Sequence, residues 1–180
     1  MTASKKKAEA MPDPSHDSSS PTAAVLTISD SAHRGERVDQ SGPAVREALA
    51  AKGFLIVGSE IVPDDQTSIE NSLIEWCDRV QLVVTTGGTG LAARDVTPEA
   101  TSSVSDRLVP GIPERMRVEG ANKTPFAALS RGVCGVRHTS LILNLPGSPK
   151  AAAESLAAVI DLLPHALDLL RGQTAHSSTG

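Results

Sequence analysis

Short apolar runs alternate with amphipathic stretches through the middle of the chain. Four runs rich in Val, Ile, Leu and Thr, at residues 23–29, 54–62, 80–86 and 139–145, have the length and β-branched content of buried strands. Between and after them, apolar residues recur every three to four positions, as they do on the packed face of a helix. The alternation predicts an α/β fold, a three-layer αβα sandwich around a mainly parallel sheet.

Capping residues indicate where the first two helices begin. Ser41 is expected to cap a helix that has Pro43 in its first turn and ends at Gly53. Thr67 and Glu70 have the spacing of a capping box, which predicts a second helix after the Pro-Asp-Asp break that ends the second strand.

Three further helices are expected in the second half of the chain. The Thr-Pro-Glu sequence at residues 97–99 predicts a short helix to about residue 105, and another helix is expected over residues 113–120. A Ser-Pro pair at residues 148–149 starts the last helix, which Pro164 should kink or end early.

The chain is expected to fold as one domain between two tails. Its 180 residues are enough for one core. Residues 1–22 and 173–180 are polar and offer almost nothing to bury, so both segments are expected to be disordered. The domain would then cover residues 23–172.

Composition narrows the class of protein. Hydrophobic residues make up 39% of the chain and charged residues 21%, a balance typical of globular domains. The net charge of −4 and the aromatic content of 2% argue against a nucleic-acid surface. No apolar run reaches the roughly 20 residues that cross a bilayer, and no apolar segment follows the N-terminal lysines as in a secretory signal. We therefore expect a cytoplasmic protein that binds neither nucleic acid nor membranes.

Cys77 and Cys134 lie in apolar surroundings, which favours buried thiols over a disulfide or a metal site.

The segments that follow the four predicted strands carry glycines, hydroxyls and carboxylates. The carboxyl ends of parallel strands meet at one edge of a sheet, where α/β proteins bind their ligands. These segments are therefore expected to form one site for a phosphorylated ligand and a divalent cation. The candidate residues are Asp30, Ser31, Asp64, Thr86, Gly87, Gly88, Thr89, Gly90, Asp95, Pro146, Gly147 and Ser148. Ser130 is a further candidate, whereas its neighbour Arg131 is expected to be an exposed arginine.

Each of these residue types has a functional and a purely structural interpretation. The glycine loop at residues 87–90 can offer backbone N–H groups to an anion, or it can simply be a tight strand exit. Asp64 and Asp95 can hold Mg²⁺ directly or through water, or they can bond nearby backbone as turn residues. The start of the last helix suits a phosphate, and Ser148 can equally be a plain cap. The loop lacks the lysine of a P-loop and matches the dinucleotide pattern G-x-G-x-x-A only loosely.

Short motifs of one known family recur in order along the predicted domain. They are residues 27–31 (TISDS), 39–42 (DQSG), 85–90 (TTGGTG), 94–101 (RDVTPEAT), 110–114 (PGIPE), 129–132 (LSRG) and 144–149 (NLPGSP). Together they resemble the molybdopterin-binding family, which includes the MogA and MoaB proteins of molybdenum cofactor biosynthesis. The resemblance spans essentially the whole predicted domain, and it implies a three-layer α/β fold and a homotrimer.

The resemblance also implies an activity. In the adenylyltransferase members, the terminal phosphate of molybdopterin attacks the α-phosphate of ATP in the presence of Mg²⁺, and pyrophosphate leaves. By resemblance, the two key acids are Asp64 and Asp95, the glycine loop is residues 87–90, and the second phosphate or nucleotide loop is residues 146–148. The implied partners are molybdopterin, ATP and a molybdenum insertase that receives the product.

Three other functions stay open at this point. The Ser-Pro-Lys sequence at residues 148–150 resembles the MoaB-like branch, some members of which are thought to bind the pterin without being the main adenylyltransferase. A molybdenum insertase shares the fold in one domain but carries further domains, for which this chain has no room. A dinucleotide-dependent oxidoreductase needs an acidic residue at the end of a strand about 20 residues after the glycines, and no such strand is predicted.

Overall fold

The computed structural model describes residues 20–172 of the chain. The tails expected at residues 1–22 and 173–180 therefore lie outside the described residues, except for residues 20–22. None of the helices described in this range is long and apolar enough to cross a membrane.

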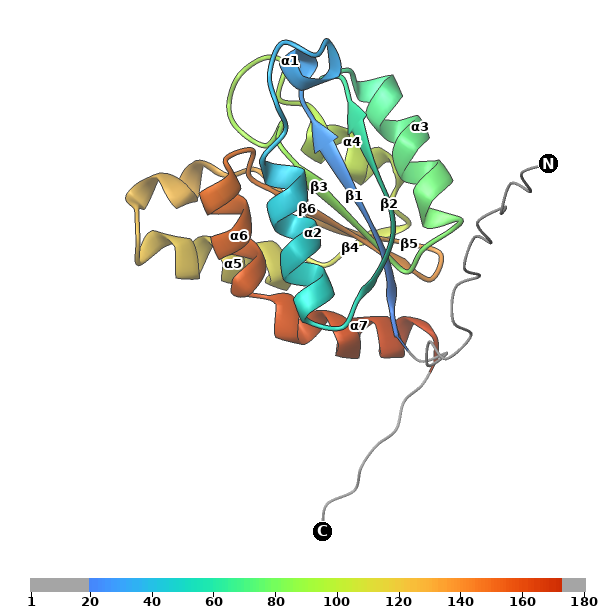
Figure 1. Cartoon of the computed structure of the whole chain (residues 1–180). Coiled ribbons are helices and arrows are strands. Elements are labelled where there is room, and N and C mark those ends of the chain that lie inside the picture. Colours follow the sequence, from blue (N-terminus) through green and yellow to red (C-terminus); the bar gives the residue numbers. More distant parts are fainter. Residues whose placement is uncertain (1–19, 173–180) are drawn as a thin grey trace, which may run out of the picture.

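A six-stranded sheet forms the middle layer, with strand order β2-β1-β3-β6-β5-β4 (Figure 1). The four predicted strands are all present and run parallel. They are β1 (Thr22–Ile28), β2 (Leu55–Val62), β3 (Leu82–Thr86) and β6 (Ser140–Leu145). The predicted α/β fold with a mainly parallel sheet is therefore confirmed.

Two short strands at one edge of the sheet were not predicted. They are β4 (Arg107–Leu108) and β5 (Cys134–Arg137), which pair antiparallel with each other, and β5 also pairs antiparallel with β6. The turn between β5 and β6 contains His138 in the left-handed region, with φ 53°. Neither strand has the continuous apolar run by which the four parallel strands were recognised.

Helices cover both faces of the sheet (Figure 1). On one face, the side chains of the sheet pack against α2 (Ser41–Ala51), α5 (Gly111–Ala121), α6 (Pro149–Ala157) and α7 (Leu163–Leu170). On the other face they pack against α3 (Gln66–Cys77) and α4 (Thr97–Val104). Three short helical segments complete the chain: α1 (Asp30–His33), the 3-10 helix η1 (Pro125–Leu129) and the 3-10 helix η2 (Ile160–Leu162).

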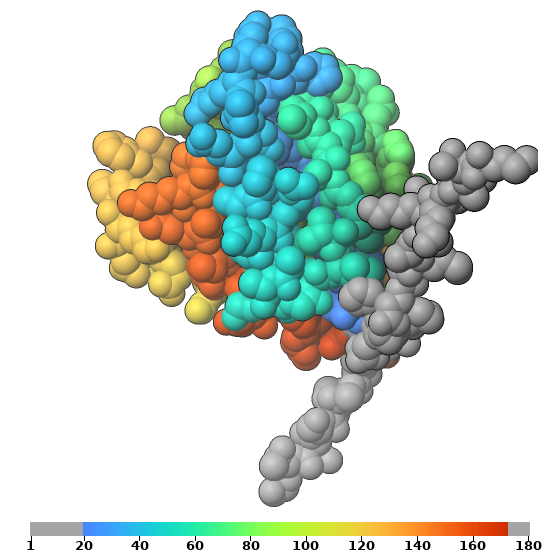
Figure 2. Space-filling view, in the orientation of Figure 1, coloured from blue at the N-terminus to red at the C-terminus, as the bar shows by residue number. Residues whose placement is uncertain are grey.

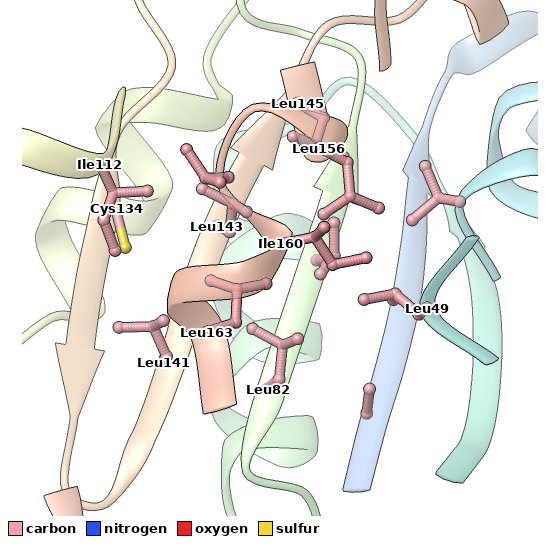
Figure 3. Close-up of a cluster of buried hydrophobic side chains, with 14 of the residues drawn as sticks. Leu49, Leu82, Ile112, Cys134, Leu141, Leu143, Leu145, Leu156, Ile160 and Leu163 are labelled. Atoms are coloured by element: carbon pink, nitrogen blue, oxygen red, sulfur yellow. The ribbon is translucent and has the colours of Figure 1, made fainter. Parts of the chain in front are cut away.

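Aliphatic side chains make up nearly all of the core. Figure 3 shows Leu141, Leu143 and Leu145 of β6 packed near Leu156 and Leu163 of the C-terminal helices. Both cysteines are buried free thiols, as expected, and burial raises the pKa of each to about 12. The expected break of the last helix is also found, because α6 ends before Pro164 and α7 begins with this proline in its first turn.

The first two predicted helices, α2 and α3, do not begin with the predicted caps. Ser41 is the first residue of α2 and not its cap; the carboxylate of Asp39 accepts from the backbone N–H groups of Ser41 and Gly42, both at 3.1 Å. Asp65 caps α3 and accepts from the backbone N–H of Ser68 at 2.9 Å, so the predicted Thr67–Glu70 capping box is wrong. In both cases an aspartate two residues before the predicted cap accepts from the first N–H groups of the helix.

A fully buried asparagine connects β6 to its neighbours. The side-chain amide of Asn144 donates to Thr85 Oγ1 at 3.0 Å and to Thr101 Oγ1 at 2.9 Å, and its oxygen accepts from the backbone N–H of Val133 at 3.2 Å. Because the side chains of Asn144, Thr85 and Thr101 are fully buried and have no water to replace a lost partner, the network fixes β6 against β3 and α4.

Replacing this asparagine should destabilise the fold. We expect Asn144→Ala to lower the free energy of unfolding by about 3 kcal/mol, because two fully buried hydroxyls and the partly buried N–H of Val133 each lose a hydrogen-bond partner. Urea unfolding measures the change, with Asn122→Ala at the exposed end of α5 as the control. A loss no larger than that of the control would contradict the role of the network.

Candidate functional site

A glycine turn follows β3 at the edge where the parallel strands end. Gly87 and Gly88 both have positive φ, 94° and 63°. A Cβ atom on Gly87 would lie 2.4 Å from the carbonyl oxygen of Ile28, and one on Gly88 would lie 2.2 Å from Thr97 Oγ1. The Thr97 hydroxyl in turn donates to the carbonyl of Gly87 at 3.0 Å. The turn is therefore enclosed between the end of β1 and the start of α4, with no space for a side chain.

A cavity of about 600 Å³ lies on one side of this turn. One of its walls is polar and consists largely of predicted site residues: Gly88, Thr89, Gly90, Asp95, Ser130, Pro146 and Gly147. The other wall comes from α5, the segment that follows it, η1 and α6. It is mostly apolar, with Met116, Phe126, Leu129 and Ala157 among its residues, and it also carries four charged residues, Arg117, Glu119, Lys123 and Glu154. In Figures 1 and 2, α5 and η1 form an arm that stands out from the body of the molecule beside α6.

A second, smaller cavity of about 240 Å³ lies on the other side of the turn. It shares Gly88 and Gly147 with the first cavity. Its other lining residues come mainly from the end of β1, the segment before α2 and the end of β3, and they include Ser29, Arg37, Asp39, Gln40, Ser41, Thr86 and Gly87. The glycine turn and Gly147 therefore separate two neighbouring cavities at one edge of the sheet.

Asp95 borders the larger cavity in a defined orientation. Its Oδ2 accepts from the backbone N–H of Ala92 at 2.8 Å, and its own N–H donates to the carbonyl of Ala92 at 2.9 Å. Oδ1 makes no hydrogen bond with any residue that the structure describes, so it is available to a ligand.

Asp30 and Asp64 hold each other at the ends of β1 and β2. Asp64 Oδ2 accepts from the backbone N–H of Asp30 at 2.7 Å, and Asp30 Oδ1 accepts from the N–H of Asp64 at 3.1 Å. Arg94 joins the pair, at 2.5 Å from Asp30 Oδ2 and 3.3 Å from the carbonyl of Asp64. The loop that carries Asp95 is thereby linked to the two neighbouring strands.

Four predicted site residues lie at this edge but line neither cavity. Asp30 and Asp64 have the mutual contacts just described, and the hydroxyl of Ser31 lies 3.2 Å from that of Ser29. Ser148 is exposed and accepts from the backbone N–H of Ala151 at 3.1 Å, so it caps α6. The remaining candidates border at least one cavity.

Two groups of cavity residues, and the contacts of one residue beside the cavities, were not predicted. Residues 37–41 border the smaller cavity, although the Asp-Gln-Ser-Gly segment was one of the motifs that carry the family resemblance. The apolar wall from α5 and η1 was missed because its residues have the same pattern as core residues. Arg131 was expected to be exposed, but its side chain bonds to the loop of Asp95.

Known proteins resemble the chain over most of its length. A family model described as "Probable molybdopterin binding domain" matches residues 24–165. A Helicobacter pylori J99 protein named molybdopterin adenylyltransferase is 47% identical over 152 residues, which cover 82% of this chain and 86% of that protein. The protein of the same name from Escherichia coli K12 is 41% identical over 164 residues, which cover 82% of this chain and 84% of that protein. The crystal structure of the molybdopterin biosynthesis enzyme MoaB from Thermus thermophilus matches with a TM-score of 0.80 and 55% identity, over 84% of this chain and 97% of that one.

The lack of space at the glycine turn leads to a paired prediction. Gly35 has a similar positive φ of 73°, but a Cβ atom there would meet nothing within 4 Å. Gly35→Ala should therefore lower the free energy of unfolding by only about 1 kcal/mol, the cost of placing an alanine in the left-handed region. Gly88→Ala should lower the free energy of unfolding by clearly more, because its methyl group also collides with Thr97. Urea unfolding of the two variants compares the losses, and equal values would mean that the turn is not enclosed.

Proposed function

Because this chain belongs to the molybdopterin-binding domain family, we propose that it acts in molybdenum cofactor biosynthesis as a molybdopterin adenylyltransferase. The terminal phosphate of molybdopterin attacks the α-phosphate of ATP, pyrophosphate leaves, and adenylyl-molybdopterin is formed. The observation that carries the proposal is the pair of cavities that share Gly88 and Gly147, since a transfer between two ligands needs both to meet at one point.

The chemistry of the larger cavity suits the pterin. Small-molecule sites are mostly apolar with a few placed polar groups. The wall with Met116 and Phe126 can cover a flat ring system, whereas the wall with Gly88 and Gly90 offers backbone N–H groups. The smaller cavity has hydroxyls and Arg37 in its lining, which suits part of ATP. The reacting phosphates would then meet at the glycine turn.

The acids at this edge fit a magnesium ion. Mg²⁺ takes oxygen ligands and keeps several waters, so one or two carboxylates are enough. No group of three acidic, histidine or cysteine side chains among residues 20–172 is placed to hold a metal by itself. The Oδ1 atoms of Asp95 and Asp64 have no hydrogen-bond partner among the described residues. Asp95 would hold the ion from the wall of the larger cavity, and Asp64, which borders neither cavity, would hold it through water. When bound, the ion would neutralise charge on the leaving pyrophosphate.

The protein's own contribution to such a transfer is positioning and charge stabilisation. No covalent nucleophile is required, because the attacking oxygen belongs to molybdopterin. Asp95 would orient the ligands from the polar wall, and the backbone N–H groups of Gly88 and Gly147 would hold phosphate oxygens. Arg94 and Lys150, near this edge, would add positive charge as negative charge develops on the phosphates.

The proposal extends to the setting of the enzyme. By its resemblance to the family, the protein would work as a cytoplasmic homotrimer. Its product, an activated pterin, would pass to a molybdenum insertase.

An assay with the purified protein tests the function. Molybdopterin, ATP and Mg²⁺ together should give one pyrophosphate per adenylyl-molybdopterin formed, and omission of any one should abolish release. Binding of molybdopterin without pyrophosphate release would instead identify a non-catalytic pterin-binding protein.

Removing the charge of Asp95 should affect turnover more than binding. We expect Asp95→Asn to lower kcat about 100-fold, the scale of losing one charge-stabilising group, while the Kd for molybdopterin changes less than threefold. Steady-state pyrophosphate release and fluorescence titration of the pterin measure the two quantities. Asp161→Asn is the control, because Asp161 is an exposed acid paired with Lys52 at the end of α2, away from the glycine turn. Equal losses in kcat and affinity would contradict the assigned role.

A further inference from the structure

The loop between the glycine turn and α4 has little packing of its own. Residues 91–94 are exposed, and Leu91 is 68% exposed despite its apolar side chain. Nevertheless the loop carries Asp95 at its end. Without buried side chains, its conformation depends on hydrogen bonds from other segments.

Arg131 supplies these bonds on one side of the loop. Its Nε donates to the carbonyl of Gly90 at 2.7 Å and its Nη2 donates to the carbonyl of Asp95 at 2.5 Å. Its backbone N–H also donates to the carbonyl of Thr89 at 2.9 Å. One planar guanidinium group therefore connects the two ends of the exposed loop, a geometry that a lysine cannot reproduce.

The same side chain forms an ion pair with Glu99 in the first turn of α4. The hydrogen bond from Arg131 lowers the pKa of this carboxyl group. However, Glu99 is 46% exposed, and ion pairs at such positions contribute little to stability. The contacts of Arg131 with the two carbonyls can therefore be separated experimentally from its ion pair.

The segment around Arg131 is itself held from the other side. Arg117 of α5 donates to the carbonyls of Ser130 and Gly132, at 3.5 and 3.3 Å. This second guanidinium limits the movement of the backbone from which Arg131 extends. Arg131 is not among the residues that line either cavity, whereas Gly90 and Asp95 both line the larger one.

From this geometry we propose that Arg131 is a positioning residue for the transfer reaction. It holds the carbonyls of Gly90 and Asp95 at a fixed separation and so places the Asp95 carboxylate against the ligands, without touching them. The inference rests on the proposed adenylyltransferase function for its catalytic consequence, but not for its effect on the loop. Misplacement of a catalytic group by about 1 Å is enough to lower a rate about 100-fold.

Four variants separate the carbonyl contacts from the ion pair. Arg131→Ala and Arg131→Lys should each lower kcat about 100-fold with less than a threefold change in the Kd for molybdopterin. Glu99→Gln and Glu99→Ala, which remove only the ion pair, should stay within threefold of the unchanged protein in both quantities. Arg131→Lys keeps the stem and the charge, so it remains informative if Arg131→Ala folds poorly. Guanidinium ion at millimolar concentration should restore at least tenfold of the lost kcat to Arg131→Ala, whereas ammonium ion should not.

A measurement without substrate tests the loop directly. Hydrogen exchange of the amides of residues 88–96 should be faster in both Arg131 variants than in the unchanged protein or the Glu99 variants. Equal exchange in all of them, or equal kcat losses in the Arg131 and Glu99 variants, would overturn the positioning role. If the unchanged protein releases no pyrophosphate but the exchange difference is found, the proposed function fails and the control of the loop by Arg131 stands.

Discussion

The close approach of the glycine turn to its neighbours is the constraint on which the site depends. At Gly87 the backbone comes so near to the end of β1 that even a methyl group would meet the carbonyl of Ile28 at 2.4 Å, and a Cβ on Gly147 would lie 3.2 Å from the Gly87 Cα. Three strands can therefore end against one another with main chain on main chain. The two cavities lie beside this junction, and both have Gly88 and Gly147 in their lining. A ligand there meets N–H groups that no side chain covers.

The polar groups near this junction are of two kinds. Those inside the fold are buried and hydrogen-bonded to one another, whereas those of the Asp95 loop are exposed and are held by arginine side chains. Asn144 and the threonines it contacts are fully buried, and Ser41 Oγ lies 2.9 Å from Thr86 Oγ1 under the start of α2. Such networks are rigid because every member would lose a partner on moving. The loop of Asp95 lacks this support and relies on Arg94 and Arg131. The buried networks thus fix the position of the glycine turn, where phosphates would bind. Arg94 and Arg131 fix the orientation of the Asp95 carboxylate toward those phosphates.

The sequence was sufficient for those features that depend on local pattern. The four parallel strands were predicted because each is an apolar run with a clear end, and their common direction brought the polar segments to one edge. The caps of α2 and α3 were wrong, because Asp39 and Asp65 have local signals as good as those of Ser41 and Thr67. The role of Arg131 and the apolar wall from α5 and η1 depend on contacts with residues distant in the chain. Neither has a local signal, since an arginine after a short loop is usually exposed and an apolar helix face usually belongs to the core.

The proposed ligands, molybdopterin and ATP, are anionic, and the chain is acidic overall. Binding them therefore requires positive charge to be concentrated at the site. The net charge is −4, so the overall field does not attract phosphates. The topology resolves this difficulty, because in a parallel α/β fold each helix that follows a strand begins at the edge where the strand ends. The first turns of α2 and α6 border the cavities through Ser41, Pro149 and Ala151, so the positive ends of these two helix dipoles lie at the site. Where an acid is needed at this edge, its negative charge is partly offset: Arg94 pairs with Asp30 and Arg131 pairs with Glu99. Asp95 is the acid of the larger cavity's polar wall, and its carboxylate has no such ion pair among the described residues, which is consistent with its proposed contact to magnesium.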